Sequence, residues 1–349
     1  MTKKIVLIVG ARPNFIKMIP VYNSLISRDY NVSIVHTGQH NDYNMSKIFF
    51  DQLNIPEPDF MVEIDNSSTC LQISSIISSL AAVLLNISPD LVVVFGDVTS
   101  TIAASITANK LGFKLAHIEA GLRSGDKSMP EEINRIITDH LSDFLFVSEL
   151  SGIENLNKEG INKQIFLVGN TMIDTLIENM NKIKKQKTED YILVTLHRPS
   201  NVDGTQLRII MSMLDVISKN IKIVWPLHPR TKKRILEQGI DLSNFCIKEP
   251  QGYIEFQNLL VNCQLVLTDS GGISEEASFL SVSCLTIRDT TERPLTLISQ
   301  CGSNILIKPE NIIQEVNNII SNNKKFNCNS ELWDGKASER ICDVLDQIL

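Results

Sequence analysis

The sequence lacks the marks of a disulfide-bonded, zinc-binding or membrane-spanning protein. Its seven cysteines are scattered, and none belongs to a Cys-x-x-Cys pair, so neither a disulfide framework nor a metal site is indicated. No run of 18 apolar residues occurs, which predicts no membrane span. The apolar run near the N-terminus has only six residues before Arg12 follows, too short for the core of a signal peptide. We therefore expect a cytoplasmic protein with reduced thiols.

Two nucleotide-binding fingerprints and a basic surface are also missing. The turn after the first apolar run reads Gly-Ala-Arg-Pro rather than GxGxxG, and no GxxxxGK[ST] occurs. These absences disfavour NAD chemistry and P-loop phosphoryl transfer. The formal net charge is −7, and the basic clusters are short. An acidic chain without a basic stripe argues against a nucleic-acid partner.

What the sequence does contain is a regular alternation of short apolar runs with segments of helical period. Continuous apolar strands of this kind are typical of parallel sheets covered by helices on both faces. A polar stretch near 170–190 divides the strands into two series. We predict an α/β protein of two Rossmann-like doubly wound domains, 1–170 and 171–335, that face a central cleft. The expected strands are 5–10, 32–38, 91–97, 114–121, 144–148 and 165–169, then 191–197, 221–228, 245–249, 264–270, 284–287 and 304–307.

Polar residues gather where these strands end. Ligands of such sheets bind beyond the carboxyl ends of the strands, so the pattern predicts one binding cleft lined by both domains. The seven groups are Gly10-Ala11-Arg12, Thr37-Gly38-Gln39-His40, Gly96-Asp97, Glu119-Ala120-Gly121, His197-Arg198, His228-Pro229-Arg230 and Asp269-Ser270-Gly271-Gly272.

The segment 117–135, HIEAGLRSGDKSMPEEINR, holds four carboxylates and four basic side chains. It has a structural interpretation: Ser128 and Glu131 fit a capping box around Pro130, and Glu131 can pair with Arg135 one turn later. It has a functional one too, because carboxylates beside cations are what acid/base catalysis uses. The residues alone leave both open.

The segment TDSGGISEEA predicts a strand that ends at Asp269 and a helix that begins at Ser270. Gly271 and Gly272 let an anion approach the free N–H groups of the helix start, and Glu276 can accept hydrogen bonds from a pair of hydroxyls. A plain capped helix with early acidic residues fits equally well.

Basic and imidazole side chains follow the first strand of each predicted domain. Arg12 and Lys17 can reach an anion held at the glycine pair, and His197 ends the first strand of the second domain. Most lone residues of these types are structural, so their binding role depends on the neighbouring motifs.

Nine motifs together make the chain resemble the non-hydrolysing UDP-N-acetylglucosamine 2-epimerases, over nearly its whole length. They occur in order as GARPNFIKMIP, TGQH, VFGDVTST, HIEAGLRSGDKSMPEEINR, VGNTMID, VTLHRPSN, PLHPRT, DSGGISEEA and RDTTERP. The resemblance implies a GT-B-like fold whose last helix, about 336–349, packs back on the first domain. It also implies a cytoplasmic homodimer that supplies UDP-N-acetylmannosamine for surface polysaccharides. The family's catalytic positions fall on Lys17, Asp97, Glu119, Glu131, Arg135 and His197, and its UDP-binding positions on Arg12, Ser270, Gly271, Gly272 and Glu276.

The chain departs from this family in two places. Many bacterial members bind a second substrate molecule as activator through a QHxxM-type stretch. Here QHNDYNM is two residues longer before Met45, and no arginine stands around Thr69-Cys70-Leu71, so the resemblance does not extend to allosteric activation. The GARPNF start also resembles relatives that act on diacetamido uronic acid sugars, whereas Glu292-Arg293-Pro294 favours the N-acetylglucosamine type.

The resemblance implies a reaction that needs no redox cofactor. UDP leaves C1 while a base removes the C2 proton, which gives 2-acetamidoglucal, and UDP then re-adds with the proton on the opposite face. The candidate acids and bases are Asp97, Glu119 and Glu131. The leaving diphosphate can be stabilised by Arg12, Arg135, His197 and the helix start at 270–272. Lys17 can stabilise the diphosphate as well or tune the pKa of a carboxylate. The alternatives are a hydrolysing epimerase, a GT-B glycosyltransferase that needs an acceptor, and a nucleotide-sugar sensor without turnover.

Overall fold

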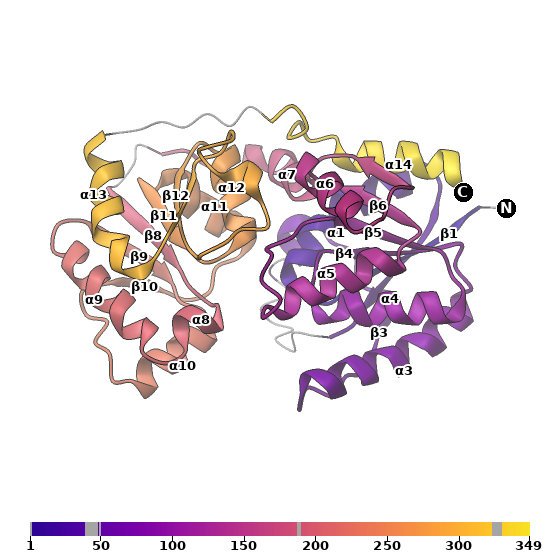
Figure 1. Ribbon diagram of the computed structural model, residues 1–349, viewed down its shortest axis with the longest axis horizontal. Coiled ribbons are helices and arrows are strands. Elements are labelled where there is room, and N and C mark those ends of the chain that lie inside the picture. The colour runs from indigo at the N-terminus through magenta and orange to yellow at the C-terminus, as the bar shows by residue number, and fades with distance from the viewer. Residues whose placement is uncertain (1, 39–47, 49, 187–189, 323–329) are drawn as a thin grey trace. The chain divides into compact units, whose positions relative to one another are not determined.

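The computed structural model describes residues 2–38, 48, 50–186, 190–322 and 330–349 (Figure 1). They form two compact units. Unit 1 comprises Met1–Glu178 and Glu331–Leu349, and unit 2 comprises Asn179–Ser330. His40 and the QHNDYNM stretch lie outside the described residues.

Unit 1 is built on a seven-stranded parallel sheet of order β3-β2-β1-β4-β5-β6-β7. Its strands are β1 (Lys4–Val9), β2 (Asn31–His36), β3 (Phe60–Met61), β4 (Leu91–Phe95), β5 (Leu115–Ala120), β6 (Phe144–Val147) and β7 (Ile165–Leu167). Its helices are α1 (Arg12–Ser27), α3 (Thr69–Ile87), α4 (Thr99–Leu111), α5 (Pro130–Leu141), α6 (Leu150–Lys158), α7 (Thr171–Glu178) and α14 (Ala337–Ile348).

Unit 2 is built on a six-stranded parallel sheet of order β10-β9-β8-β11-β12-β13. Its strands are β8 (Tyr191–Thr195), β9 (Lys222–Pro226), β10 (Cys246–Lys248), β11 (Leu265–Thr268), β12 (Ser283–Ile287) and β13 (Asn304–Ile307). Its helices are α8 (Pro199–Val202), α9 (Gln206–Ser218), α10 (Pro229–Glu237), α11 (Tyr253–Asn262), α12 (Gly271–Phe279) and α13 (Ile312–Asn322), with 3₁₀ turns η1 (Met180–Lys182), η2 (Pro294–Thr296) and η3 (Pro309–Asn311).

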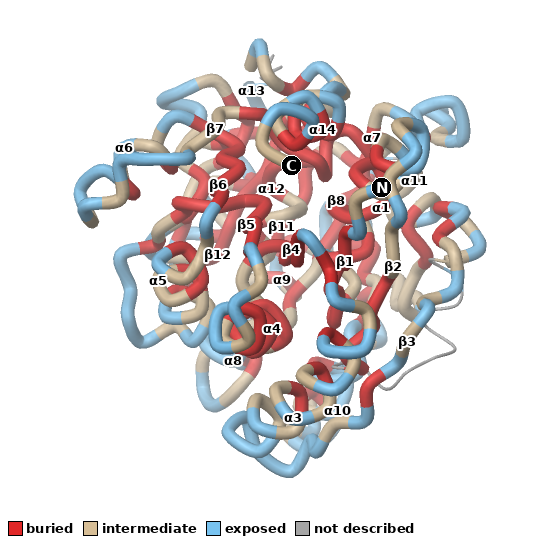
Figure 2. Tube along the Cα trace, turned by 90° about the vertical axis from the view of Figure 1, so that its right-hand side faces the viewer, coloured by how far each residue is buried: buried red, intermediate tan, exposed pale blue. Residues whose placement is uncertain are grey.

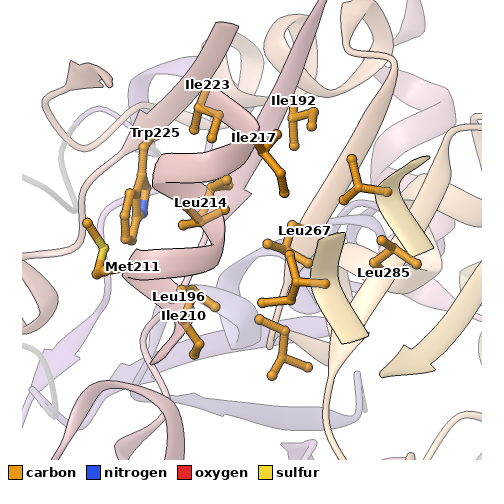
Figure 3. Packing of buried hydrophobic residues seen from close by; sticks show 14 of the residues in the cluster. Ile192, Leu196, Ile210, Met211, Leu214, Ile217, Ile223, Trp225, Leu267 and Leu285 are labelled. Atoms are coloured by element: carbon orange, nitrogen blue, oxygen red, sulfur yellow. The ribbon is translucent and has the colours of Figure 1, made fainter. Parts of the chain in front are cut away.

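The α/β architecture of both units confirms the predicted fold class. Strands β1, β4, β8 and β11 are buried along nearly their whole length (Figure 2), as continuous apolar strands between helical layers should be. In unit 2, α9 places Ile210, Met211 and Leu214 on one side at helical spacing. They pack with Trp225 of β9 in the apolar cluster shown in Figure 3.

Each sheet has a point where the strand order reverses. In unit 1 the reversal falls between β1 and β4, and in unit 2 between β8 and β11. Loops that leave the carboxyl ends of two such strands turn to opposite faces of the sheet and leave a crevice between them. The fold therefore makes the residues after β1 and β4, and those after β8 and β11, the first places to search for function.

The C-terminal helix α14 belongs to unit 1. Its first turn is capped by Asp174 of α7, whose carboxylate accepts the N–H groups of Ala337 at 3.2 Å and Ser338 at 2.7 Å. Arg28, after α1, pairs with two acidic side chains of α14. Helix α7 also clusters with unit 1, whereas the sequence analysis places residue 171 onward in the second domain.

Helix α3 is long and apolar enough to cross a membrane by length and composition. The sequence analysis predicts no span because serines interrupt the apolar run. In unit 1, Ile76, Leu80 and Leu84 form one buried stripe of α3, and the helix packs against α4. One buried stripe is typical of a helix that covers a sheet or another helix.

Candidate functional site

In unit 1, a buried ion pair joins the ends of α1 and β5. Lys17 pairs with Glu119, and both side chains are less than a tenth exposed. Glu119 has φ of 73°, at the point where the β5–β6 register shifts between Ile118 and Ala120. This bulge turns the Glu119 side chain out of the regular alternation of the strand. A non-glycine residue with positive φ at such a place is costly and indicates a functional constraint.

Gly96, after β4, lies directly against this pair. A Cβ atom built on Gly96 would stand 3.1 Å from Lys17 Nζ and 3.2 Å from Glu119 Oε2, and its φ is +61°. Only glycine takes this backbone conformation without strain. The chain therefore reaches Asp97 through a turn that brings its backbone up to the Lys17–Glu119 pair.

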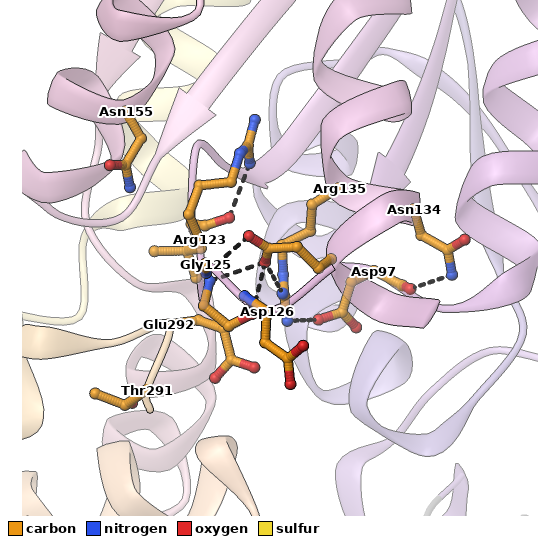
Figure 4. Close-up of polar contacts among 12 residues, drawn as sticks. Asp97, Arg123, Gly125, Asp126, Asn134, Arg135, Asn155, Thr291 and Glu292 are labelled. Atoms are coloured by element: carbon orange, nitrogen blue, oxygen red, sulfur yellow. Dashed lines mark hydrogen bonds and ion pairs between the residues drawn. The ribbon is translucent and has the colours of Figure 1, made fainter. Parts of the chain in front are cut away.

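A second ion pair joins Asp97 to Arg135 of α5 (Figure 4). Asn134 donates its side-chain amide to the backbone carbonyl of Asp97 at 2.8 Å. The Arg135 side chain is almost fully buried, whereas that of Asp97 is a fifth exposed. The Asp97 carboxylate is thus held by a cation while part of it remains open to a ligand.

The neighbouring carboxylates Glu131 and Glu132 have opposite environments. Glu132 is 2% exposed and accepts the N–H groups of Ser124 at 2.8 Å and Gly125 at 2.9 Å, with Arg135 Nη1 at 3.2 Å. Glu131 is partly exposed and makes no hydrogen bond or ion pair with the residues that the structure describes. Glu132 therefore holds the loop before α5, and Glu131 is the carboxylate available to a ligand.

The predicted capping box at Ser128 and Glu131 is wrong. Helix α5 begins at Pro130 with Met129 as its N-cap, and no side chain caps it. Ser128 instead donates its hydroxyl to Asp126 at 2.7 Å. The predicted Glu131–Arg135 pair does not form either, since Arg135 turns toward Asp97 and Glu132, at the ends of the buried strands.

Arg12 opens helix α1 beside the same switch point and is partly buried. The turn before it is fixed by Asn14, whose Oδ1 accepts the Ala11 N–H at 3.1 Å and whose amide donates to Phe95 O at 2.8 Å. Gly10 has no room for a side chain, because its Cβ would meet Ser100 Oγ at 1.9 Å. These contacts hold the start of α1 against the end of β4.

In unit 2, His197 and Asp269 follow the switch-point strands β8 and β11. The His197 ring faces the buried Asp269 carboxylate, with Nδ1 3.0 Å from Oδ1. The same carboxylate accepts the N–H groups of His197 at 3.1 Å and Arg198 at 2.9 Å. Burial opposes ionisation of Asp269, but the hydrogen bond and charge of His197 outweigh it and lower its pKa. Nδ1 therefore carries the hydrogen, and Nε2 is the nitrogen left for a ligand.

Helix α12 begins beside this pair, with Ser270 as an N-cap whose side chain makes no capping bond. Gly271 in its first turn packs against Arg293, because a Cβ on Gly271 would stand 2.5 Å from Nη1. Arg293 is held by Glu275, whose Oε2 lies 2.9 Å from Nε. The helix start and the guanidinium together form a positive surface suited to phosphate oxygens. Gly272 follows in the same turn, partly exposed.

Glu276, one turn further along α12, is buried beside Tyr253 and Gln257 of α11. Burial raises its pKa to about 7, against the opposing effect of those two neighbours. Glu276, the Tyr253 hydroxyl and the Gln257 amide thus form one buried polar group, in which the two neighbours act on the carboxylate by hydrogen bonding.

All eleven residues singled out from the sequence thus lie at one of two places. Lys17, Asp97, Glu119, Glu131, Arg135 and Arg12 surround the β1–β4 switch of unit 1, whereas His197, Ser270, Gly271, Gly272 and Glu276 surround the β8–β11 switch of unit 2. Sequence reasoning gave no site role to Glu132, Asn134 or Asp269. Of these three, only Asp269 could have been found from the sequence, because it lies in one of the polar groups at the predicted strand ends. Among the described residues, no three His, Cys, Asp or Glu side chains are grouped for a metal ion.

Comparison with known proteins gives these clusters a context. The family model described as UDP-N-acetylglucosamine 2-epimerase matches residues 25–346. A UDP-N-acetylglucosamine 2-epimerase of Methanocaldococcus jannaschii is 41% identical, over 98% of both chains. A UDP-2,3-diacetamido-2,3-dideoxy-D-glucuronate 2-epimerase of Pseudomonas aeruginosa is 40% identical, over 99% of this chain and 100% of that one.

A solved structure supports the same relationship. The crystal structure of the Methanocaldococcus jannaschii UDP-GlcNAc 2-epimerase in complex with UDP-GlcNAc and UDP has a TM-score of 0.92 and 40% identity, over 99% of each chain. This agreement confirms the predicted GT-B-like fold class. The fold defines an α/β protein of this class. The chain belongs to the UDP-N-acetylglucosamine 2-epimerase family and is an epimerase, which makes it an isomerase.

Proposed function

We propose that this enzyme interconverts UDP-N-acetylglucosamine and UDP-N-acetylmannosamine by inverting C2 of the sugar. The observation that carries this proposal is the pair of carboxylates at the unit 1 switch point, each beside its own cation. Lys17 faces Glu119, and Arg135 faces Asp97. Relatives at about 40% identity named for this reaction give further support.

The proposed reaction is an elimination followed by re-addition. A carboxylate removes the C2 proton while the C1–oxygen bond breaks, and its electron pair leaves with UDP. The neutral product is 2-acetamidoglucal. UDP oxygen then bonds to C1 again, and C2 takes a proton on its opposite face. Atoms and charge balance without an oxidant or reductant, so no redox cofactor is required.

Inversion at C2 needs proton transfer on both faces of the sugar. We propose that Asp97, Glu119 and Glu131 supply these groups, since all three stand at the same switch point. The cations beside Asp97 and Glu119 favour their ionised forms, which suits a base. Positioned proton transfer of this kind accelerates a reaction by roughly 10²–10⁴-fold.

The nucleotide is proposed to bind at the start of α12. Its diphosphate would take the free N–H groups at Ser270, Gly271 and Gly272. Charge that develops on the leaving diphosphate is stabilised by such fixed donors. The buried Glu276 carboxylate would accept the ribose hydroxyls. Arg293, packed against Gly271, adds a guanidinium to the same surface.

Proton NMR of the purified enzyme with UDP-N-acetylglucosamine in D₂O tests this proposal. We expect deuterium at C2 and the growth of UDP-N-acetylmannosamine, without cofactor or acceptor. Free N-acetylmannosamine plus UDP would identify a hydrolysing epimerase instead. Binding with no exchange at C2 would indicate a sensor, and turnover only with an added acceptor a glycosyltransferase.

A second substrate is favoured by a specific observation, the 40% identity to the diacetamido glucuronate epimerase of Pseudomonas aeruginosa over its whole length. The same spectrum should be recorded with that UDP-sugar. Exchange at C2 that is faster by more than about tenfold with the diacetamido sugar would assign this chain to that reaction.

We also propose that the enzyme is a cytoplasmic homodimer. Its support is α3, which carries no charged residue and exposes Leu71 and Leu85 on unit 1. Exposed apolar patches on soluble proteins mark interaction surfaces. Light scattering of the wild type and of Leu85→Glu tests this: a wild-type monomer would contradict it.

A further inference from the structure

His117 of β5 is a fully buried ionisable side chain that the proposed reaction does not use. Its exposed fraction is 0%. Nε2 lies 2.8 Å from the backbone carbonyl of Gly96, and Nδ1 lies 2.7 Å from Oδ1 of Asp139 on α5. The ring therefore bridges helix α5 and the turn that leads to Asp97.

Both partners of the ring can only accept hydrogen bonds. A backbone carbonyl has no hydrogen to donate, so Nε2 must carry one. The Asp139 carboxylate also accepts the Gly121 N–H at 3.1 Å and pairs with Arg123 at 2.7 Å. Burial alone would raise the pKa of Asp139, but the charges and hydrogen bonds of His117 and Arg123 lower it. The Asp139 carboxylate, on the other side of the ring, holds Nδ1 in place.

His117 contacts the carbonyl oxygen of Gly96, the residue at which the chain turns toward Asp97. The Gly96 N–H donates to Ile118 O at 3.0 Å, and its carbonyl accepts from His117, so β5 holds Gly96 on both sides. A hydrogen bond to the Gly96 carbonyl fixes the plane of the Gly96–Asp97 peptide, because a peptide unit is rigid. Asn134 then fixes the carbonyl of Asp97 itself.

Helix α5 supplies several supports of Asp97. Asn134 and Arg135 of α5 contact it directly, and Asp139, one turn later, acts through His117. The other charged groups near the pair are Arg123, which is itself paired with Glu159, and the Lys17–Glu119 pair on the opposite side of Gly96.

We propose that His117, held by Asp139, is a positioning residue that sets the Gly96–Asp97 peptide and thereby the Asp97 carboxylate for proton transfer. This inference rests on the proposed role of Asp97. A misplacement of about 1 Å at a reacting group can cost roughly 10²-fold in rate. The hydrogen bond therefore acts on turnover and leaves the nucleotide site of unit 2 unaffected.

Two substitutions separate the two hydrogen bonds of the ring. His117→Gln places its amide nitrogen near Nε2 and keeps a donor for Gly96. His117→Asn places its amide nitrogen near Nδ1 and keeps only the contact with Asp139. Leu115→Ala, in the same strand and fully buried, is the control for a general loss of stability. The melting temperature, kcat, KM and the Kd for UDP are measured for all four proteins.

We expect His117→Asn to lower kcat by about 10–100-fold, with KM and the Kd for UDP within about twofold of wild type. His117→Gln should keep most of the wild-type kcat. Leu115→Ala should have a lower melting temperature at nearly unchanged kcat. Equal turnover in His117→Asn and Leu115→Ala would overturn the inference. So would an equal loss in both His117 variants, since Gly96 would not then be the point of action.

Nitrogen-15 NMR of the His117 ring tests the hydrogen bond to Gly96 without reference to turnover. We expect Nε2 to carry a hydrogen that exchanges slowly with solvent, and an Nε2 without a hydrogen would overturn the inference. A wild-type enzyme that fails to exchange C2 of either UDP-sugar would contradict the proposed function instead. In that case the ring spectrum still decides whether His117 donates to Gly96.

Discussion

Asp97 and Arg135 form an ion pair although 38 residues separate them along the chain. Asp97 follows β4 and Arg135 lies on α5, and the parallel order of β4 and β5 brings the two together. Asp97 keeps part of its carboxylate exposed while the guanidinium is buried. The arrangement holds a carboxylate in place for a ligand instead of merely stabilising the sheet.

Replacing Asp97 by Asn should abolish most of the turnover. We expect kcat to fall by at least about 10²-fold, because proton transfer by a positioned group accelerates a reaction by at least that factor. UDP should still bind to unit 2. Turnover by C2 exchange and UDP affinity by calorimetry check this. Asp90→Asn, before β4 instead of after it, is the matched control and should retain full activity. Normal turnover in Asp97→Asn would remove Asp97 from the mechanism.

Glu131 and Glu132 should respond in opposite ways to the same substitution. Glu132→Gln removes a buried carboxylate that accepts two backbone N–H groups, so the free energy of unfolding should fall by about 1–3 kcal/mol. Glu131→Gln should leave that free energy unchanged and lower kcat by about 10²-fold. Urea unfolding and C2 exchange measure the two effects. An equal decrease in the free energy of unfolding in both variants would mean that both residues serve stability and that Glu131 is not a catalytic group.

The buried Glu276 should make substrate binding depend on pH near neutrality. Burial raises its pKa to about 7, so the carboxyl is neutral below that pH and ionised above it. An ionised carboxylate accepts two hydroxyl hydrogen bonds, so the affinity for UDP-N-acetylglucosamine should rise as the pH increases through about 7. Calorimetric titrations from pH 5.5 to 8.5 test this. Glu276→Gln should flatten the profile, and an unchanged profile in that variant would assign the effect elsewhere.

Glu276 should affect folding stability in the opposite direction: its contribution decreases as the pH rises, whereas the affinity for the substrate increases. Between the unfolded pKa, about 4.3, and about 7, the folded protein holds a proton that the unfolded chain has released. Stability therefore decreases as the pH rises through this window, and the loss is largest once the pH exceeds the folded value. Thermal unfolding of wild type against Glu276→Gln should show a smaller decrease in the variant.

Asp269 should contribute to stability in the opposite pH range. Its pKa is lowered in the folded protein, so its contribution is present above about pH 4, the unfolded value, and is lost as the pH falls through the lower folded value. Asp269→Asn should remove that part of the acid sensitivity and should also lower kcat, because the His197 ring loses the negative charge that faces it. Urea unfolding between pH 3 and 7 measures the first effect.

The strand pattern of both units could be predicted from the sequence, because buried parallel strands are continuous apolar runs. All twelve expected runs contain or overlap a strand. Strand β3 could not be predicted: Phe60 and Met61 form a two-residue edge strand, partly exposed, with no apolar run around it. Its pairing with Val35 and His36 depends on the neighbouring strand rather than on its own residues.

The partners within the site could not be read from local patterns. Glu131 and Arg135 have the spacing of a helical ion pair, but Arg135 meets Asp97 and Glu132 at the buried ends of the sheet, where an unpaired carboxylate would cost more. Lys17 and Glu119 are 102 residues apart, and only the sheet order brings them together. Local sequence indicates where charged groups stand, whereas the order of strands determines which of them meet.

The cap that Asp174 places on α14 has a consequence for the synthesis of the chain. Unit 1 is made of two segments, Met1–Glu178 and Glu331–Leu349, with all of unit 2 between them in the chain. Unit 2 can reach its final form while unit 1 still lacks the helix that covers α1 and α7. Unit 1 is therefore completed last, and a version produced alone needs residues 331–349 joined after residue 178.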